Sequence, residues 1–466
     1  MKPKNFVPSL IVGFFLYFRV ILGLGIDRNK ECTVTPLGVG QDDTDQVLAA
    51  ISQCGTNGTI TFTEGSFNIT RKMTWELNSA KVNLFGYLNA TLYFSQFIPD
   101  IEYWLNMSNT YQVVFIQSQS SWFVVTGSDF EIDAHNTGGI QGNGQIWWDF
   151  FSNRTKEDGD GRPISLTLFN ATRGVVRDFR IDAQPFWCNC IAESDDVVYD
   201  GMLCNATNTN PEFAGTNLVP NTDGLDTYRS NNVTLMNWDI TCGDDCLASN
   251  TTNLTVRNVT CNGGNGIAFG SLGQYVNLRD VIENVYMEDL QMVRLPSDVQ
   301  PNMGTGVYFK SWTGEVNGTP PTGGGGGTGH VRNVTIQNVN VDQVDIPVHV
   351  YQTNGGSASE TPSTLMFSGL HFNDWTGNAT GNTSSFILFV CSPAVNCTDL
   401  SFELFNVTPA ANEAPRYICQ NVTSITGLQG KSDKILRNQP DLCIWALGIQ
   451  HRVTPLESLK KAEQRR

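Results

Sequence analysis

Histidine and basic residues are scarce in this sequence. It has 5 His among 466 residues, and its 29 Lys and Arg are outnumbered by 45 Asp and Glu, so the formal net charge is −16. So acidic a chain is not expected to bind nucleic acid or an anionic membrane, because both would repel it. The shortage of histidine also argues against a zinc site among the cysteines.

Long apolar runs are missing everywhere except at the beginning of the chain. Residues 6–24 are almost entirely apolar and follow Lys2 and Lys4, which is typical of a secretory signal segment and less so of a signal anchor. We expect residues 1–25 to be removed, which deletes Lys2, Lys4 and Arg19 and moves the formal charge from −16 to −19. The mature protein would then be secreted and extracellular.

All 12 cysteines lie after residue 25, and an even number is expected of a secreted protein with disulfides. Proximity along the chain suggests the pairs Cys32–Cys54, Cys246–Cys261, Cys391–Cys397 and Cys419–Cys443. The pairing among Cys188, Cys190, Cys204 and Cys242 is open. About eighteen Asn-X-Ser/Thr sequons are present, and the glycosylation candidates include Asn89, Asn106, Asn153, Asn170 and Asn378.

No Pro/Ser-rich linker divides the chain, although its length would ordinarily suggest two or more domains. We expect one long domain over residues 26–453, followed by a charged tail over residues 454–466 that is a short helix or disordered. We also expect a monomer.

Asp223, Asp244 and Asn265 are equally spaced along the chain, each in a Gly-rich polar segment. These segments read Asn-Thr-Asp-Gly-Leu-Asp from Asn221, Gly-Asp-Asp-Cys from Gly243 and Gly-Gly-Asn-Gly from Gly263. The same step relates Asn232 to Asn253 and Asn237 to Asn258. A period of about 20–25 residues with short alternating apolar stretches is typical of a solenoid, here one built of strands. Residues one period apart would lie a strand spacing of ~4.8 Å from one another.

The same pattern predicts further coils and two loops. Coils are expected near residues 175–181, 197–202, 233–240, 254–260, 281–292, 334–341 and 346–351, and residues 138–149 resemble one coil that ends in Trp147 and Trp148. These tryptophans are more easily explained by core packing than by sugar stacking. Residues 274–280 lengthen their coil and are expected to project as a loop. The glycine run at residues 323–327 predicts a mobile loop, since no Lys-Ser/Thr follows it as in a phosphate-binding loop.

Stacked coils would gather Asp223, Asp244 and Asp245 into one acidic cluster on a rigid sheet. Carboxylates this close shift one another's pKa values apart, which favours acid and base catalysis. A calcium site made by the same three acids is the alternative. Lys310 adds a cation nearby, which suits a ligand that itself carries a carboxylate, so we expect no metal and no other cofactor.

The segments that begin at Asn221, Gly243, Gly263 and Gly270, followed by Tyr308-Phe-Lys, come in an order that resembles glycoside hydrolase family 28. This family contains the polygalacturonases and rhamnogalacturonases of pectin breakdown. Residues 142–149 resemble the coil before the active site in this family, and the resemblance extends over roughly residues 30–450. It implies a right-handed parallel β-helix, an all-β fold, and hydrolysis with inversion. A pectic polysaccharide or oligosaccharide would be the substrate.

The resemblance also implies roles for individual residues. Asp244 corresponds to the general acid, Asp223 and Asp245 to the pair that activates water, and Lys310 to a lysine that binds the sugar carboxylate. Cys246 and Cys261 correspond to a disulfide that braces the turn. Inversion would need carboxyl groups ~6.5–9.5 Å apart, so that a water fits between sugar and base. Asp245 could instead be purely structural, and the base is not assigned between Asp223 and Asp245.

Two positions depart from the polygalacturonase pattern. Asn265 stands in place of a histidine, and Tyr308 in place of an arginine, which weakens the case for an all-galacturonate chain. Tyr308 could face a neutral deoxy sugar such as rhamnose, and Asn265 could be a substrate ligand or a turn residue. The segment from Gly270 and the residues after Lys310 resemble the exo-acting branch, in which inserted loops close one end of the cleft.

The first hypothesis is therefore a secreted exo-acting hydrolase that trims terminal rhamnose or galacturonate from rhamnogalacturonan. An exo-polygalacturonase acting on homogalacturonan is the alternative. A calcium-dependent pectate lyase, or a carbohydrate-binding solenoid that has lost activity, stays open as a further possibility.

Overall fold

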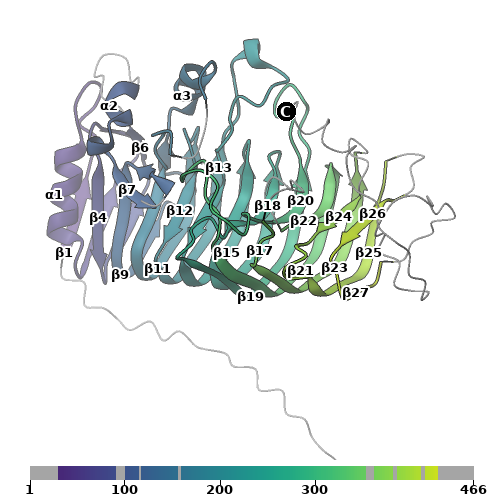
Figure 1. The fold of residues 1–466 in the computed structure, drawn as a ribbon. Helices are drawn as coiled ribbons and strands as arrows, with labels where there is room; N and C mark the ends of the chain where they lie inside the picture. The colour runs from purple at the N-terminus through teal and green to yellow at the C-terminus, as the bar shows by residue number, and fades with distance from the viewer. Residues whose placement is uncertain are drawn as a thin grey trace, which may run out of the picture.

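The computed structural model describes residues 30–90, 100–114, 117–155, 159–352, 361–380, 386–410 and 415–428. The expected signal segment, the charged tail and Cys443 lie outside the described residues. Within these ranges the chain winds into a long ribbon of parallel strands that runs from α1 to β27 (Figure 1). The predicted parallel β-helix is confirmed.

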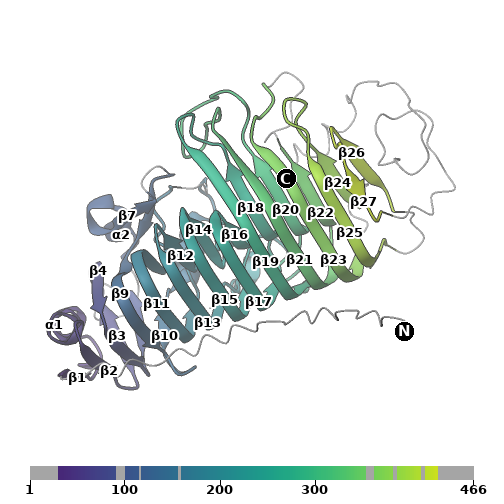
Figure 2. The ribbon, with the colours of Figure 1, turned by 90° about the horizontal axis from the view of Figure 1, so that it is seen from below.

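Strands of successive coils form two parallel series. The first series contains β12 (Asn189–Ala192), β14 (Leu225–Tyr228), β16 (Asp245–Ser249), β18 (Gly266–Leu272), β20 (Thr305–Ser311), β22 (Ile346–Tyr351), β24 (Ile387–Val390) and β26 (Tyr417–Gln420). The second series contains β9 (Phe123–Asp133), β11 (Leu166–Asp182), β13 (Asp195–Asn205), β15 (Ser230–Thr241), β17 (Thr251–Asn262), β19 (Arg279–Val293), β21 (Thr328–Val344), β23 (Met366–Ala379), β25 (Thr398–Thr408) and β27 (Ile425–Thr426). Figure 2 shows these strands side by side along the solenoid.

The first coils at the N-terminal end are built from shorter strands. They are β1 (Lys30–Val34), β2 (Gly58–Phe62), β3 (Ser66–Ile69), β4 (Met73–Asn78), β5 (Lys81–Leu84), β6 (Tyr87–Ala90) and β10 (Gly139–Gln141). Helix α1 (Thr44–Cys54) packs against this end and buries Val47, Ala50 and Ile51. An antiparallel pair, β7 (Tyr111–Val114) and β8 (Gln119–Ser121), and the short helices α2 (Ile101–Leu105), η1 (Met107–Asn109) and η3 (Pro211–Phe213) lie outside the coils.

The strand register confirms the predicted period. Val233 of β15 pairs with Leu254 of β17, the residue one repeat further along the chain, and both side chains are buried. Alternate residues of each strand point into the solenoid, where apolar side chains of neighbouring coils stack into one continuous core. Polar residues at the strand edges are thereby held at fixed positions outside that core.

Asparagines of the repeat columns lie at exposed bends within strands β15 and β17. Asn232, Asn253 and Asn258 all have left-handed backbone conformations, which asparagine tolerates better than most residues. The amide of Asn253 donates to Asn231 (2.8 Å), and that of Asn258 donates to Asn237 (2.7 Å). The repeated asparagines thus form hydrogen bonds from one coil to the next along the surface.

The segment expected to be one coil over residues 138–149 is only partly a strand. β10 is followed by helix α3 (Gly144–Phe151), so Trp147 and Trp148 belong to a helix and not to the end of a solenoid coil as expected. Both tryptophans are buried in the main core, since the helix turns its apolar face onto the solenoid. They pack the flank of the solenoid and offer no surface for sugar stacking.

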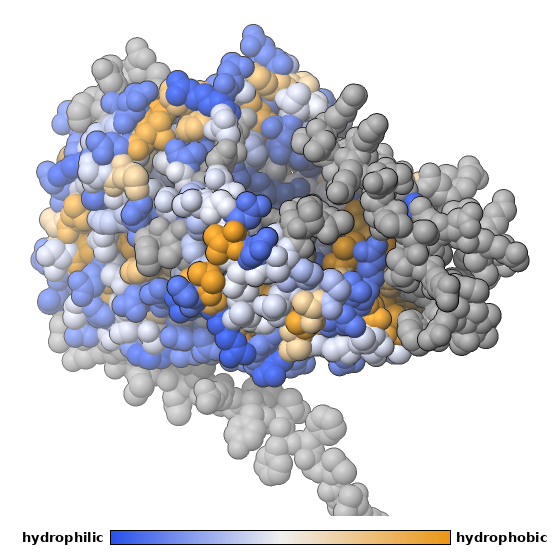
Figure 3. Space-filling model, in the orientation of Figure 1, coloured by the Kyte–Doolittle hydropathy of each residue, from blue (hydrophilic) through white to orange (hydrophobic). Residues whose placement is uncertain are grey.

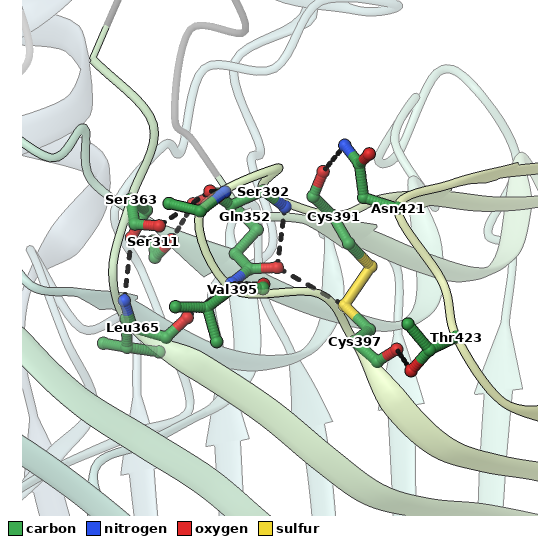
Figure 4. The surroundings of a disulfide bond; sticks show 11 residues. Ser311, Gln352, Ser363, Leu365, Cys391, Ser392, Val395, Cys397, Asn421 and Thr423 are labelled. Carbon is green, nitrogen blue, oxygen red and sulfur yellow. Dashed lines mark hydrogen bonds between the residues drawn. A yellow bond between two sulfur atoms is a disulfide. The ribbon is translucent and has the colours of Figure 1, made fainter.

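Within the described residues, disulfides join Cys32–Cys54, Cys188–Cys204, Cys246–Cys261 and Cys391–Cys397. Cys190 and Cys242 are buried thiols. Near the C-terminal coils, Gln352 is buried beside the Cys391–Cys397 bond, accepting from the Ser392 amide (2.8 Å) and donating to the Val395 carbonyl (2.8 Å), as Figure 4 shows. These bonds fix the chain where it leaves β22 and β24.

The outer surface is largely hydrophilic on the face seen in Figure 3, with hydrophobic residues in small groups. Among the glycosylation candidates, Asn106, Asn153 and Asn170 are exposed, whereas Asn89 and Asn378 are half-buried. Among the described residues, no helix is both long enough and apolar enough to cross a membrane.

Candidate active site

Three aspartates meet where two successive coils enter the first strand series. Asp223 precedes β14, Asp244 precedes β16, and Asp245 is the first residue of β16. One carboxylate oxygen of each lies within 4.8 Å of one oxygen of each of the others. The acidic cluster inferred from the repeat spacing therefore exists, because parallel stacking places one coil directly on the next.

Asp244 is the member of the cluster that is partly open to solvent. One of its carboxylate oxygens accepts from the backbone N–H of Asn221 (2.9 Å), and the other accepts from the side-chain amide of Asn265 (2.9 Å). Asn221 has a left-handed backbone, which turns its N–H toward the cluster. These three residues come from three successive coils, so the stacking itself orients Asp244. Asn265 holds Asp244 and does not line the cavity described below.

Asp245 is the most enclosed of the three, with 3% of its surface exposed, against 5% for Asp223. The pKa of Asp245 is raised to about 6, chiefly by burial and also by the neighbouring Asp244, although Lys310 and a hydrogen bond from Tyr308 oppose the rise. The Lys310 ammonium lies 3.5 Å from an Asp245 oxygen. Near pH 6 the Asp245 carboxyl group can therefore both bind and release a proton.

Lys310 and Tyr308 stand beside one another on β20. Burial lowers the pKa of Lys310, but Asp245 and the other carboxylates outweigh it and hold that pKa above its ordinary value. The ammonium donates to the Tyr308 hydroxyl (3.2 Å) and lies 4.8 Å above the Tyr308 ring centre. Tyr308 is 5% exposed, and burial raises the pKa of its phenol. It lies beneath the cluster and is not part of the cavity lining.

A cavity of about 290 Å³ opens in front of the aspartates. Its lining combines Asp223, Asp244, Asp245 and Lys310 with aromatic side chains of Trp187, Tyr228, Tyr275 and Trp312. Among the described residues of this lining, Lys310 is the only Lys or Arg. A volume of this size suits one sugar unit or two, with carboxylates and one ammonium at the reacting end and aromatic surface around them.

Part of the lining is a loop wall, by which we mean residues 117–121, 273–278 and 313–327. Gln274 joins its three segments: its amide donates to the carbonyls of Pro321 (2.7 Å) and Gly323 (2.9 Å), and its oxygen accepts from Gln117 (3.2 Å). With 4% of its surface exposed, Gln274 is itself buried.

Both predicted loops contribute to this wall. Most of residues 274–280 form a loop before β19, in which Val276 is exposed while Gln274, Tyr275 and Leu278 line the cavity. The glycine run, predicted as a mobile loop, forms backbone hydrogen bonds with this loop. Gly325 donates to the Gln274 carbonyl (2.6 Å) and Gly327 to the Gly273 carbonyl (3.0 Å). The run packs closely, since a side chain at Gly324, Gly325 or Gly327 would collide with neighbouring backbone.

Arg162 supports the cluster from below and was not singled out in the sequence. Its side chain is buried, lies over the Phe186 ring and pairs with Asp160 (2.8 Å). It also donates to the Pro220 carbonyl and to the Asn221 side chain, both at 2.8 Å. Arg162 thus fixes the turn whose Asn221 N–H reaches Asp244. No sequence signal identifies it, since the contact spans 59 residues.

The Cys246–Cys261 disulfide lies directly behind the cluster, since Cys246 follows Asp245 in β16 and Cys261 lies in β17. It ties β16, which begins at Asp245, to the following strand β17. The three aspartates could also hold a metal ion by their geometry. The positive charge of Lys310 beside Asp245 would repel a divalent cation bound to the same carboxylate oxygens.

Both the sequence and the fold are similar to those of known proteins. The family model described as "Glycosyl hydrolases family 28" matches residues 77–429. The chain is 38% identical over 417 residues to "Putative galacturan 1,4-alpha-galacturonidase A" of Aspergillus niger, covering 84% of this chain and 92% of that protein. It is 31% identical to "Exopolygalacturonase" of Cochliobolus carbonum, covering 85% of each. Its fold is similar to that of the endo-xylogalacturonan hydrolase of Aspergillus tubingensis, with a TM-score of 0.69, 21% identity, and coverage of 86% of this chain and 100% of that one.

Proposed function

The chain belongs to glycosyl hydrolases family 28, and we propose that it is an exo-acting hydrolase that releases galacturonate from the end of a pectic galacturonan. The observation that carries this proposal is a cavity holding three aspartates and one lysine, with a loop wall as part of its lining. The names of relatives 38% and 31% identical to this chain support the exo action and the galacturonate substrate. This favours the galacturonan alternative over rhamnogalacturonan as the main substrate.

The proposed reaction uses water as the only second reactant. Asp244, the member of the cluster most open to solvent, protonates the glycosidic oxygen as its bond to the anomeric carbon breaks. Asp223 and Asp245 accept the proton of the water whose oxygen forms the new bond to that carbon. Lys310 would bind the carboxylate of the sugar at the cleavage point.

We expect inversion at the anomeric carbon, as the family resemblance implies. The nearest carboxylate oxygens, within 4.8 Å, are closer than the ~6.5–9.5 Å expected between carboxyl groups of an inverting enzyme. Three carboxyl groups still allow one to act as acid while the other two share a water. Proton NMR of the first product decides this, and retention of configuration would refute the two-base arrangement.

The main test combines product identity with one substitution. Wild-type protein is incubated with oligogalacturonates, and the early products are separated by chromatography. Galacturonate monomer should appear first, and Asp244→Asn should reduce its release by about 10³-fold or more, since a general acid that cannot donate a proton loses its role. Early release of long oligomers would contradict the exo action. Unsaturated products absorbing in the ultraviolet would indicate a lyase, and equal behaviour of Asp244→Asn and wild type would indicate a binding solenoid.

A second candidate is exo-hydrolysis of rhamnogalacturonan. It is favoured by the single Lys or Arg of the described lining and by the aromatic side chains around it, which suit uncharged sugars as well as galacturonate. Parallel digestion of homogalacturonan and rhamnogalacturonan oligosaccharides of equal length, with identification of the monosaccharide released, separates the two candidates.

We also propose that the protein is secreted and acts as a monomer. The disulfides of the described residues support an oxidising compartment. Light scattering coupled to size-exclusion chromatography tests the monomer, and N-terminal sequencing of the protein from culture medium tests removal of residues 1–25.

A further inference from the structure

Tyr308 is placed where sequence comparison alone suggested a sugar ligand, but its surroundings differ from those of a ligand. The ring is buried, does not line the cavity, and stacks on Tyr351 of the next coil at 6.2 Å between ring centres. Its hydroxyl points the other way, back along the column of coils, and donates to a carboxylate oxygen of Asp245.

The hydroxyl of Tyr308 is part of a closed group of three side chains. Lys310 donates to the Tyr308 hydroxyl at 3.2 Å and lies 3.5 Å from the second Asp245 oxygen, while Tyr308 donates to the first oxygen. Both oxygens of Asp245 are therefore matched by a donor from β20. Strands β16 and β20 are separated by β18, whose paired residue Ala268 is small, so the long Tyr308 side chain reaches across this coil.

We infer that Tyr308 is a positioning residue that fixes the carboxylate of Asp245 and the ammonium of Lys310 relative to each other. The inference rests on the proposed function, in which Asp245 helps to activate water. A donor hydrogen bond favours the ionised carboxylate, which is the form that can accept a proton from water. By accepting a hydrogen bond from Lys310, the Tyr308 hydroxyl also fixes the ammonium beside the Asp245 carboxylate.

The titratable groups around Asp245 come from several elements. They are Asp223 before β14, Cys242 after β15, Asp244 beside Asp245, Tyr308 and Lys310 of β20, and beyond Tyr308 the residues His349 and Tyr351 of β22. Well above pH 4 only Lys310 among them carries a positive charge, because burial lowers the pKa of His349 to about 4. Removing the Tyr308 hydroxyl therefore leaves Lys310 as the one remaining support for ionised Asp245 among these groups.

The experiment is Tyr308→Phe, with Tyr199→Phe as the matched control. Tyr199 is also buried in the solenoid, on β13, and its hydroxyl has no hydrogen-bond partner among the described residues. In Tyr308→Phe the acidic limb of the kcat/KM profile on oligogalacturonates should move upward by about one pH unit, as loss of a charge-assisted hydrogen bond predicts. Tyr199→Phe should leave the limb in place. A lower rate at every pH with an unmoved limb would overturn the inference, and a raised KM with unchanged kcat would make Tyr308 a substrate ligand.

A second readout needs no substrate and so separates this inference from the proposed function. The urea midpoint of unfolding is measured at pH 4 and pH 8 for both variants and the wild type. The hydroxyl stabilises ionised Asp245, whose pKa is about 6, so its removal should lower the midpoint more at pH 8 than at pH 4. Equal shifts at both pH values would mean that Tyr308 only packs. If the wild type hydrolysed no pectic oligosaccharide while the midpoints behaved as expected, the contact would stand and the function would fail.

Discussion

Replacement of Asp245 by asparagine should make the stability of the protein less dependent on pH. In the folded protein burial raises the pKa of Asp245 to about 6, from the 3.8 of an unperturbed aspartate. A folded pKa raised above the unfolded one contributes stability that is complete below the unfolded pKa. That contribution is lost as the pH rises through the folded pKa.

The magnitude follows from the size of the shift. About two pKa units at 1.36 kcal/mol each correspond to a full effect of about 3 kcal/mol, most of which the wild type loses between pH 4 and pH 7 through this group. Asp245 is almost completely buried, so solvent does not screen the effect away. Asp245→Asn has no such loss. Its free energy of unfolding, relative to wild type, should therefore rise by about 2–3 kcal/mol on going from pH 4 to pH 7.

The assay is urea unfolding followed by tryptophan fluorescence at the two pH values. Comparing differences between pH values removes the constant effect of exchanging a carboxyl group for an amide. Asp298→Asn, at an exposed carboxyl, is the control and should show the same difference from wild type at both pH values. Hydrolysis should be lost in Asp245→Asn, because the amide cannot accept the proton of the attacking water. An equal difference at pH 4 and pH 7 would refute the burial argument.

Three further predictions concern the surroundings of the aspartates. Gln274→Ala removes the hydrogen bonds to Gln117 and to the glycine-rich segment, so longer oligomers should appear among the first products. The free energy of unfolding should fall by about 1–3 kcal/mol. A product pattern identical to wild type would show that the loop wall does not depend on Gln274. Arg162→Lys removes the hydrogen bond that holds Asn221. We expect a loss of kcat of roughly 10- to 100-fold with little change in KM, because a small misplacement of Asp244 slows the reaction without weakening substrate binding. An equal change in kcat and KM would contradict this role. Treatment with EDTA should leave the rate within about two-fold of the untreated enzyme, since the mechanism needs no metal, and loss of activity restored by calcium would revive the calcium-site alternative.

The spacing of motifs along the sequence predicted the solenoid fold and the acidic cluster at the centre of the site. The regular step between repeated motifs identified the solenoid, because the coil length of a β-helix is repeated in the chain itself, and it placed Asp223, Asp244 and Asp245 together. The exception was residues 144–151, where a run of aromatic residues forms a helix. Short apolar segments do not distinguish a buried helix from a strand, and only packing against the flank of the solenoid decides between them.

The remainder of the site depends on contacts between distant residues. Gln117 and Gln274 meet across 157 residues, and Arg162 reaches Asn221 across 59, so no spacing in the sequence announces either contact. Tyr308 illustrates the same limit, since its position in a motif suggested a sugar ligand while its burial turned it toward Asp245. A repeat in the sequence determines the length of each coil and which residues of neighbouring coils stack on one another. Loop closure, burial and the direction of a side chain arise only when the coils and their insertions pack together, because those properties belong to neighbours that the chain brings in from elsewhere.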